Sequence, residues 1–417
     1  MINGGKALMG RLTVPSAKNA ALPIIAASLM ADGETTVKSC PQLSDIQSSV
    51  QIINSIGSRA VMENGGLSIT YADSECCEIS PDLCGKMRSS ILYLAPLLYR
   101  KGKAVVYQPG GCNLGSRKID IHIEGLCRMG ARVEYDGDKI LLFAPDGLKA
   151  VHYRLRLPSV GATQTLIMAA CVAKGITVLH NCAREPEVAD LAGFLNRAGA
   201  KIVGAGKSEV IIRGVDRLCG VEYTPIPDRI FAATVLSAVS ACKGICLLNN
   251  YPQEYMSGFE KLLKHAGLKI IHYSNSALLV KCIDKACDIS VHTGYYPAFS
   301  TDMGPLLSSA MVNNNGTLKI YEGVFENRFS YMPQFKKLGL CCYADGKQYY
   351  QTQQSDVHTA RLAAQDLRAG AAIVVAALAK RGRFTVEGLQ YIDRGYQNLE
   401  QILALLGADI RRISVEE

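Results

Sequence analysis

The sequence predicts an α/β protein of two domains, each with helices buried inside and sheets outside. Two sets of glycines recur at intervals of about 70 residues, which indicates six repeated units. Helical stretches that are apolar nearly all round alternate with short β-branched strands. A chain of 417 residues has room for two large domains, so we expect three units in each.

The glycines mark the same two points in every repeat. The first set opens a short strand and consists of Gly33, Gly102, Gly175, Gly244, Gly316 and Gly382. The second set ends a helix before another strand and consists of Gly57, Gly130, Gly199, Gly267, Gly339 and Gly407. Because the two sets agree, each unit is predicted to run from a buried helix through a strand and a second helix to a β-hairpin.

The two helices of a unit differ in character. Residues 369–379 are apolar on every side, which predicts a buried helix, whereas residues 45–56 and 399–406 are amphipathic. The apolar stretch at 20–31 could pass for the core of a signal peptide, but Pro23 interrupts it. We therefore interpret it as the first buried helix.

Composition excludes several classes of protein. The net charge of +8 is spread along the chain without a Lys/Arg block, which disfavours a nucleic-acid groove. No apolar run is long enough to span a membrane. The 15 cysteines include no Cys-x-x-Cys pair and no two histidines have ligand spacing, so no metal site is predicted. Cysteines in apolar stretches, such as Cys171, Cys242 and Cys246, indicate structural thiols in a reducing cytoplasm.

Polar residues gather where the buried helices begin, fourteen residues before each strand glycine. These positions are Asn19, Arg88, Gly161, Ile230, Asp302 and Arg368. An acidic residue at a helix N-terminus is an ordinary cap, whereas Lys18, Arg88 and Arg368 oppose the helix dipole. We expect these cations to converge on a cleft that binds a polyanion, rather than to project into solvent.

One loop is longer in the second unit than in the others. The excess lies in residues 108–118, which contain three glycines and a proline. Such a loop is more often functional than structural. Cys112 lies at its centre with Arg117 and Lys118 downstream, and nearby cations lower the pKa of a thiol. Cys112 is therefore predicted to act as an acid or nucleophile.

Two arginines and one aspartate are further candidates for ligand binding, because they recur at fixed distances from the strand glycines. Arg328 and Arg394 each lie twelve residues after a strand glycine, which suggests a shared grip on phosphate or carboxylate. Asp302 is the acidic member of the helix-start set. Among cations it is a candidate general base or hydroxyl acceptor, with an ordinary N-cap as the alternative.

Two cofactor motifs are absent. Residues 204–208 look like the end of a phosphate-binding loop, but Lys201 stands where its first glycine belongs and strands flank the segment. No strand is followed by Gly-x-Gly-x-x-Gly, so neither a nicotinamide nor a flavin cofactor is predicted.

Ten motifs together resemble the family of UDP-N-acetylglucosamine enolpyruvyl transferases, and the resemblance runs from about residue 3 to residue 412. The motifs are SAKNAALP (16–23), KMRSS (86–90), PGGCNLGSRKIDIHIEGL (109–126), PSVGAT (158–163), REPE (184–187), PDRI (227–230), FSTDM (299–303), VFENRF (324–329), DLRA (366–369) and IDRGY (392–396). The resemblance implies a two-domain inside-out α/β barrel. It places the first domain at 18–225, the second at 1–17 and 226–417, and the active site in the cleft between them.

The resemblance also implies a reaction. The 3-hydroxyl of UDP-N-acetylglucosamine attacks carbon 2 of phosphoenolpyruvate, carbon 3 is protonated, and the tetrahedral intermediate loses phosphate. This is the first committed step of peptidoglycan synthesis, in the cytoplasm, and needs no cofactor. Cys112 matches the proton donor, which the antibiotic fosfomycin alkylates in the family, and Asp302 matches the proposed base.

The resemblance assigns substrate contacts to further residues. Lys18, Arg117 and Arg394 match the cations around phosphoenolpyruvate, with Arg88 and Arg368 nearby, and Asn19 matches a residue that contacts both substrates. The positions that match the UDP-sugar site are Arg117, Lys118, Ile119, Asp120, Ile121, Pro158, Ser159, Val160, Gly161 and Val324. Phe231 departs from the family, which usually has Glu there, and this puts the second-domain contacts in doubt.

Three alternatives remain. The related 3-phosphoshikimate 1-carboxyvinyltransferases share the fold but lack the Gly-Gly-Cys loop, so residues 109–118 argue against them. An inactive copy that only binds UDP-sugar and regulates is disfavoured by the matches at Cys112, Asp302, Lys18 and Arg394. Nucleic-acid binding is disfavoured because no basic cluster exists. The sequence does not indicate an oligomeric state.

Overall fold

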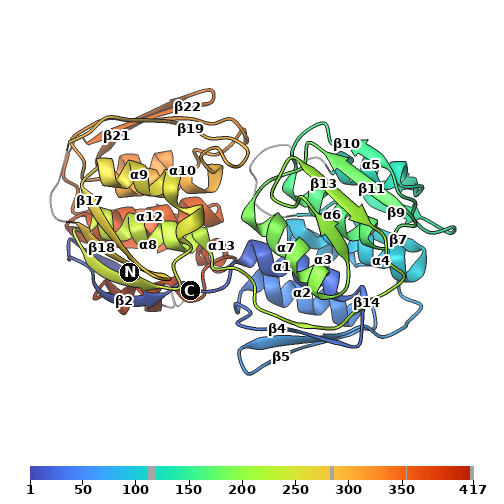
Figure 1. Cartoon of the computed structure of the whole chain (residues 1–417). Coiled ribbons are helices and arrows are strands. Elements are labelled where there is room, and N and C mark those ends of the chain that lie inside the picture. The colour runs from blue at the N-terminus through green and yellow to red at the C-terminus, as the bar shows by residue number, and fades with distance from the viewer. Residues whose placement is uncertain (111–118, 282–285, 354, 414–417) are drawn as a thin grey trace. The chain divides into compact units, whose positions relative to one another are not determined.

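The computed structural model describes residues 1–110, 119–281, 286–353 and 355–413, which form two compact units (Figure 1). The first unit comprises residues 16–110 and 119–226, and the second comprises residues 1–15 and 227–413. The expected boundaries at 18 and 225 differ from these by two residues and one.

The first unit contains three repeats, each with a small sheet. Its sheets have the strand orders β15-β4-β6-β5, β7-β9-β8 and β10-β11-β13-β12, and β3 and β14 form a further pair. The strands are β3 (Ala31–Asp32), β4 (Glu34–Val37), β5 (Arg59–Glu63), β6 (Gly66–Thr70), β7 (Lys103–Tyr107), β8 (Arg132–Asp136), β9 (Lys139–Phe143), β10 (His152–Arg154), β11 (Ile176–His180), β12 (Lys201–Val203), β13 (Glu209–Arg213), β14 (Leu218–Cys219) and β15 (Glu222–Tyr223). The helices are α1 (Lys18–Ser28), α2 (Ser44–Ser55), α3 (Pro81–Lys86), the 3₁₀ helix η1 (Arg88–Tyr93), α4 (Leu94–Lys101), α5 (Asp120–Arg128), α6 (Val160–Cys171) and α7 (Pro186–Arg197).

The second unit repeats this plan. Its sheets have the orders β17-β18-β16-β2, β19-β20-β22-β21 and β23-β24-β1-β25. The strands are β1 (Ile2–Gly4), β2 (Met9–Thr13), β16 (Ile245–Asn249), β17 (Leu268–Tyr273), β18 (Ser276–Lys281), β19 (Ile289–His292), β20 (Leu318–Tyr321), β21 (Leu340–Asp345), β22 (Gln348–Gln353), β23 (Thr359–Ala363), β24 (Gly382–Glu387) and β25 (Asp409–Ile410). The helices are α8 (Arg229–Ala241), η2 (Gln253–Tyr255), α9 (Ser257–His265), η3 (Thr301–Met303), α10 (Gly304–Ala310), α11 (Met332–Lys337), α12 (Leu367–Ala379), α13 (Leu389–Ile392) and α14 (Leu399–Ala404).

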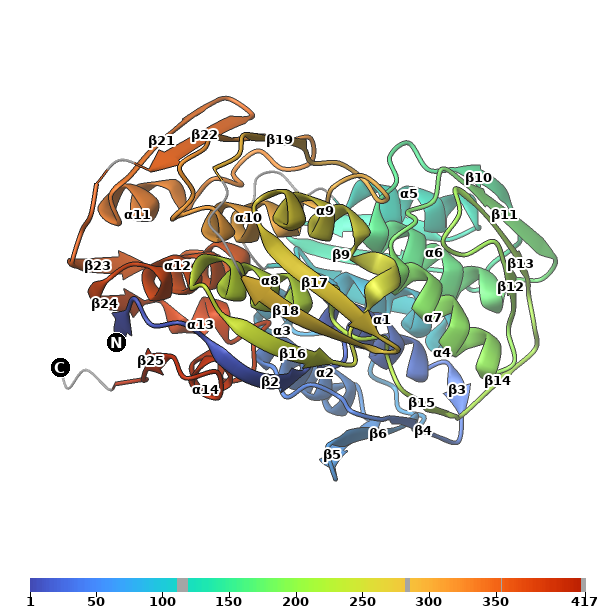
Figure 2. The same ribbon diagram turned by 60° about the vertical axis from the view of Figure 1, so that its left-hand side comes forward.

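The N-terminal segment completes two sheets of the second unit, as Figure 2 shows for β2 beside β16. β2 pairs parallel with β16, and β1 pairs antiparallel with both β24 and β25. Gly4 makes this possible because a Cβ there would lie 2.2 Å from the carbonyl oxygens of Ala377 and Lys380. The strand at the start of the chain therefore belongs with its C-terminal half.

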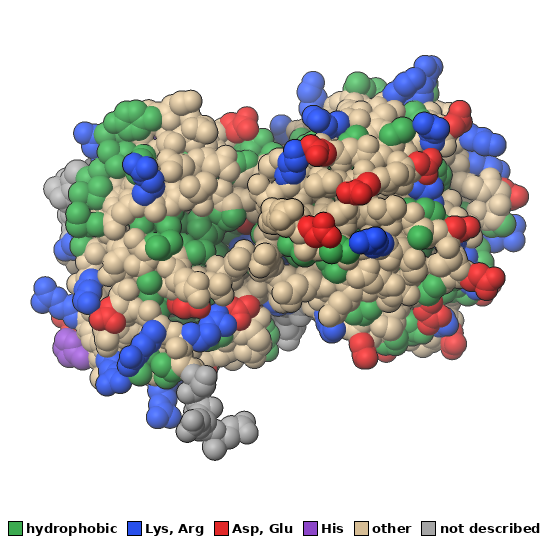
Figure 3. Space-filling model, turned by 90° about the horizontal axis from the view of Figure 1, so that it is seen from below, with side chains coloured by type: hydrophobic (Ala, Val, Ile, Leu, Met, Phe, Trp, Pro, Cys, Tyr) green, Lys and Arg blue, Asp and Glu red, His purple; other side chains and the backbone are tan. Residues whose placement is uncertain are grey.

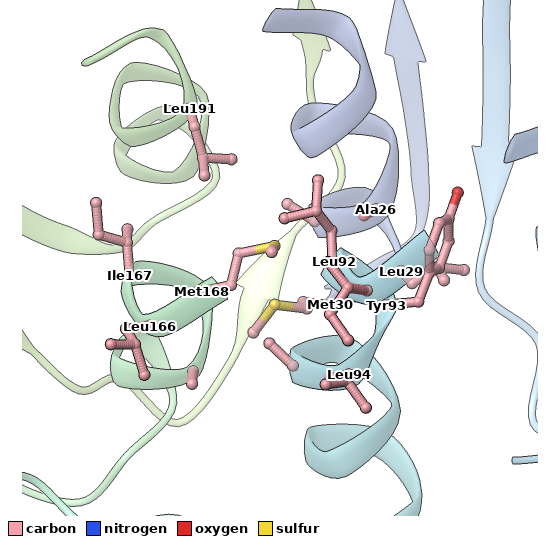
Figure 4. Packing of buried hydrophobic residues seen from close by; sticks show 14 of the residues in the cluster. Ala26, Leu29, Met30, Leu92, Tyr93, Leu94, Leu166, Ile167, Met168 and Leu191 are labelled. Carbon is pink, nitrogen blue, oxygen red and sulfur yellow. The ribbon is translucent and has the colours of Figure 1, made fainter. Parts of the chain in front are cut away.

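The predicted buried helices form the core of each unit. All thirteen residues of α8 and all thirteen of α12 are buried, because neither helix presents a polar face to solvent. Two polar side chains inside α8 bond within the helix: Thr234 and Ser237 donate to the carbonyls four residues earlier, at 2.9 and 2.8 Å. In the first unit, Met168 of α6 points towards Met30 and Leu92 in the middle of the core (Figure 4).

The second set of glycines has the backbone geometry that a helix-ending turn requires. All six lie in the left-handed region, with φ values of 85° (Gly57), 102° (Gly130), 109° (Gly199), 91° (Gly267), 82° (Gly339) and 84° (Gly407). The prediction of six helix-ending turns is confirmed.

The thiols and surface charges behave as composition predicts. Every cysteine among the described residues is a free thiol, and burial raises the pKa of Cys171, Cys242 and Cys246 to about 12. On the face shown in Figure 3, basic side chains are scattered among acidic ones in both units. Among the described residues, no helix combines the length and the apolar character that crossing a membrane requires.

The α12 helix is followed by a buried lysine whose charge is only partly compensated. Lys380 is only 3% exposed, and its Nζ has no hydrogen-bond partner among the described residues. Burial lowers the pKa of Lys380 below the ordinary value of 10.5, although Asp356 opposes the shift. The protonated side chain therefore costs stability in the folded state.

We predict that Lys380→Met raises the melting temperature, with a gain of about 1–3 kcal/mol in stability near neutral pH. The penalty is greatest below the lowered folded-state pKa and vanishes as pH rises towards the unfolded-state pKa, so the gain should shrink as pH rises from neutral towards 10.5. Thermal unfolding across this range measures it. Lys347→Met, at an exposed position, is the matched control; a gain of equal size in that variant, or one independent of pH, contradicts the prediction.

Candidate active site

Asp302 lies at the centre of a charged cluster in the second unit. Its Oδ1 accepts a hydrogen bond from Arg328 Nη2 at 2.6 Å, and its Oδ2 accepts one from Arg368 Nε at 3.2 Å. Arg328 and Arg368 are buried, at 2% and 4% exposure, whereas 27% of the Asp302 side chain is exposed. The carboxylate is therefore fixed by guanidinium groups behind it and open to a ligand in front.

The charges of this cluster decide the protonation state of Asp302. Burial alone would raise its pKa, but the guanidinium groups of Arg328, Arg368 and Arg229 outweigh burial and hold the pKa well below its usual range. Asp302 is thus ionised throughout the physiological pH range. Such a carboxylate is a strong hydrogen-bond acceptor for a hydroxyl group, whereas its basicity is low.

The starts of all three buried helices of the second unit gather at Asp302. Asp302 is the second residue of η3, Arg368 is the second of α12, and Arg229 is the first of α8. Asp228 and Asp366 are ordinary caps, since each carboxylate accepts from two first-turn amides. Asp302 binds side chains instead, so the N-cap alternative for this residue is wrong.

The sequence missed two residues that support the cluster and gave only a weak signal for a third. Glu322 is buried at 3% exposure and accepts bonds from the amides of Val324 and Phe325 and from the Thr301 hydroxyl, at 2.8 to 3.0 Å. Tyr396 hydroxyl lies 3.3 Å from Arg368 Nη1. Arg229 directly precedes the helix-start position Ile230 and has no other signal in the sequence. Glu322 has no sequence signal, because its role depends on the fold bringing η3 to the loop after β20.

Lys18 of the first unit is buried in an ion pair. Its Nζ lies 2.8 Å from Asp45 Oδ2, and both side chains are less than 10% exposed. Asp45 stands in the first turn of α2, where a carboxylate also favours the helix dipole. Asn19, the next residue, is the exposed one in an otherwise buried helix. The ion pair explains how a lysine can begin a buried helix, and it leaves Asn19 facing a ligand or solvent.

The predicted UDP-sugar residues of the first unit lie at the starts of α5 and α6. Ile119 and Ile121 are buried, and Asp120 forms an ion pair with Arg156. Pro158, Ser159, Val160 and Gly161 are half-buried, and Ser159 Oγ accepts from the Ala162 amide at 3.4 Å. Arg88 begins η1, and its charge acts on His122 of α5. Three helix starts therefore come together in this unit as well.

The remaining predicted residues are less informative. Val324 and Arg394 are half-buried in the second unit. Cys112, Arg117 and Lys118 lie outside the described residues. The structure thus brings Asp302, Arg328 and Arg368 into direct contact in one unit, and Arg88, Asp120 and Gly161 around His122 in the other.

The fold and these clusters define an enolpyruvyl transferase. The family model described as EPSP synthase (3-phosphoshikimate 1-carboxyvinyltransferase) matches residues 2–403, so the chain belongs to this family. Two solved structures share the fold: the enolpyruvyl transferase NikO from Streptomyces tendae, with a TM-score of 0.87, 24% identity and coverage of 98% and 97% of the two chains, and EPSP synthase from Acinetobacter baumannii, with a TM-score of 0.75, 18% identity and coverage of 97% of each. The predicted two-domain inside-out barrel is confirmed.

Curated relatives narrow the family. The chain is 39% identical to UDP-N-acetylglucosamine 1-carboxyvinyltransferase 2 of Staphylococcus saprophyticus over 99% of this chain and 98% of the relative. It is also 39% identical to UDP-N-acetylglucosamine 1-carboxyvinyltransferase of Endomicrobium trichonymphae over 99% of both chains. The predicted resemblance to this branch of the family is confirmed.

We predict that Asp45→Asn destabilises the protein by about 3–5 kcal/mol, because it leaves the Lys18 ammonium buried without its carboxylate. The double variant Lys18→Met/Asp45→Leu, which removes both charges, should recover most of this loss. Thermal unfolding and catalytic turnover are measured on all three proteins.

A role of Lys18 in catalysis requires that the double variant regain stability and still lack turnover. If the double variant turns over at the wild-type rate, Lys18 serves only the core. Lys38→Met is the control, because the ion pair of Lys38 with Glu222 is exposed and contributes little.

Proposed function

We propose that this chain transfers the enolpyruvyl group of phosphoenolpyruvate to the 3-hydroxyl of UDP-N-acetylglucosamine and releases phosphate. The observation that carries the proposal is the sequence identity of 39%, over 99% of the chain, to relatives named UDP-N-acetylglucosamine 1-carboxyvinyltransferase. The cluster of Asp302, Arg328 and Arg368 supports it, because a hydroxyl acceptor held among buried cations suits an alcohol nucleophile and an anionic partner.

In this proposal the two units supply different parts of one site. Lys18, Asn19 and Arg88 of the first unit, with Arg117, hold phosphoenolpyruvate, and Arg394 of the second unit completes its cationic surroundings. The starts of α5 and α6, with Lys118 and Val324, hold the UDP-sugar. An anion of three charges and a diphosphate each need several fixed cations, and these residues would supply them.

Each step of the proposed reaction has an assigned group. Asp302 accepts the hydrogen bond of the sugar 3-hydroxyl and orients its oxygen towards carbon 2 of phosphoenolpyruvate. Cys112 donates a proton to carbon 3 while the proton of the 3-hydroxyl passes to Asp302, which yields the tetrahedral intermediate. Carbon 3 then returns a proton to the Cys112 thiolate as phosphate leaves, the departing phosphate takes up the proton from Asp302, and the enolpyruvyl ether remains. Because Asp302 is ionised and weakly basic, its main contribution is orientation and stabilisation of developing positive charge on the attacking hydroxyl.

The proposed reaction places the protein in the cytoplasm, at the first committed step of peptidoglycan synthesis. Its substrates there are small molecules, and no nucleic acid or membrane is required. Arg328 and Arg368 serve chiefly to fix Asp302, whereas Arg394 contacts phosphate.

We predict that phosphate is released when phosphoenolpyruvate is supplied with UDP-N-acetylglucosamine. Shikimate 3-phosphate at the same concentration should give a rate lower by at least about 10³-fold, because discrimination between acceptors rests on hydrogen-bonding groups that the wrong acceptor leaves unpaired. A colorimetric phosphate assay with the two acceptors in parallel measures it. Faster release with shikimate 3-phosphate would assign the chain to the other branch of the family, and release with neither acceptor would favour an inactive sugar-binding protein.

We predict that fosfomycin, in the presence of UDP-N-acetylglucosamine, forms one covalent adduct on Cys112. A thiol beside cations is the more reactive because its thiolate is stabilised. Peptide mass spectrometry locates the adduct, and turnover should fall in parallel with labelling.

The control for this labelling is the exposed thiol of Cys219. Cys219→Ser should label and lose activity like the wild-type protein, whereas Cys112→Ser should remain unlabelled. An adduct on Cys219 or Cys341 with Cys112 unmodified would remove Cys112 from the proposed chemistry.

A further inference from the structure

A buried histidine in the first unit has no part in the proposed chemistry. His122 is the third residue of α5 and is only 4% exposed. Its Nδ1 lies 2.9 Å from the hydroxyl oxygen of Thr165, which belongs to α6. One ring therefore links the two helices whose first residues are proposed to hold the UDP-sugar.

The other edge of the His122 ring lies against the first turn of α6. A Cβ built on Gly161 would come within 3.0 Å of His122 Cε1 and 3.1 Å of Nε2. Such distances are shorter than ordinary carbon contacts, so a side chain at residue 161 would force the ring or the helix start to move by a few tenths of an ångström. Gly161 has an ordinary backbone conformation, since it is not among the positive-φ glycines. The glycine is therefore required by the ring rather than by the turn.

The surroundings keep His122 neutral. Burial lowers its pKa to about 3, the charge of Arg88 from η1 adds to the shift, and Asp120 on its own helix opposes it. A neutral imidazole does not attract a diphosphate through charge, and it does not transfer protons between pH 5 and 9. What remains for it is a mechanical role, in which ring thickness and one hydrogen bond set a distance.

That distance matters because a helix start binds anions through its free amides. The first amides of α6, at Val160 and Gly161, have no acceptor within the helix, as at any helix N-terminus. Asp120 and Ile121 begin α5, the helix that carries the ring. A shift of about 1 Å between such groups is enough to lower turnover or binding considerably.

We propose that His122 is a positioning residue that fixes the starts of α5 and α6 at the separation that the nucleotide sugar requires, and that Gly161 is its necessary counterpart. The inference rests on the proposed function, because it concerns the UDP-sugar site of that reaction. It predicts that changes at His122 or Gly161 weaken the binding of UDP-N-acetylglucosamine and have little effect on phosphoenolpyruvate.

The test is a cycle of three variants: His122→Ala, Gly161→Ala and the double variant. Gly161→Ala should raise the KM for UDP-N-acetylglucosamine by about tenfold or more, because the added methyl group displaces the ring and the helix start. His122→Ala should raise the same KM, because the helices close over the vacated space. The double variant should bind better than Gly161→Ala, since the methyl group then enters the space that the ring has left.

Three readouts distinguish positioning from general damage. The KM for phosphoenolpyruvate and the kcat at saturating UDP-sugar should change by less than about threefold, and the pH–rate profile should keep its shape. The melting temperature identifies a variant that fails to fold. In that case Thr165→Val takes the place of the misfolded variant, because it removes the hydrogen bond to His122 at constant volume. It should raise the KM for UDP-N-acetylglucosamine by a smaller factor.

The outcomes separate this inference from the proposed function. Calorimetric binding of UDP-N-acetylglucosamine and phosphate release are first measured on the wild-type protein; failure of both overturns the two proposals together. An active wild-type protein whose variants change both KM values equally, or whose double variant shows strictly additive losses, overturns the positioning role alone. A wild-type protein that binds the nucleotide sugar without turnover refutes the proposed reaction, and the same cycle, followed by binding, still decides the role of His122.

Discussion

Six helices that are apolar on every side must be buried, and this single constraint organises both units. A helix such as α12, with all thirteen residues buried, cannot place a charge along its length without an uncompensated cost. Charged residues are therefore found at the helix ends, whereas polar residues inside a buried helix can bond to its backbone, as Thr234 and Ser237 do. Since the ends also carry unbonded amides, the same places that tolerate charge are the places that bind anions. Chemistry at the helix starts follows from the way the core is built.

The two units neutralise the charges at their helix starts in different ways. In the second unit, Asp228 and Asp366 cap α8 and α12, and the buried arginines are balanced by Asp302. In the first unit, Lys18 is balanced by Asp45, which lies in the first turn of the amphipathic helix α2 rather than at the start of a buried helix. Balance between charges, rather than removal of charge, allows these side chains to stay buried and ionised. The result is a set of fixed cations that need not reorganise when an anion arrives.

The sequence predicted the repeats and helix starts well because both depend on local backbone geometry. Gly57 and its five counterparts all adopt the left-handed conformation that few other residues accept. The position fourteen residues before each strand glycine is the first or second residue of a helix in every repeat. The partners were not predictable. Asp45 is 27 residues from Lys18, and Thr165 is 43 residues from His122. Such pairs form only because the fold brings two helices together, and a single sequence does not show which helices become neighbours.

The repeats also explain how nearly equivalent positions acquire different roles. Arg88 and Asp302 occupy matching places in the middle repeat of each unit, and both lie in a 3₁₀ helix that precedes an α-helix. Each of those α-helices has a proline near its start, Pro96 in α4 and Pro305 in α10, and the missing N–H prevents regular α-helical bonding of the turn before it. The backbone is thus the same, while the side chains have opposite charge. Arg88 adds a positive charge beside a neutral histidine, whereas Asp302 is an anion among three guanidinium groups. One kind of helix start, used in both units, therefore presents a cation in one and a carboxylate in the other.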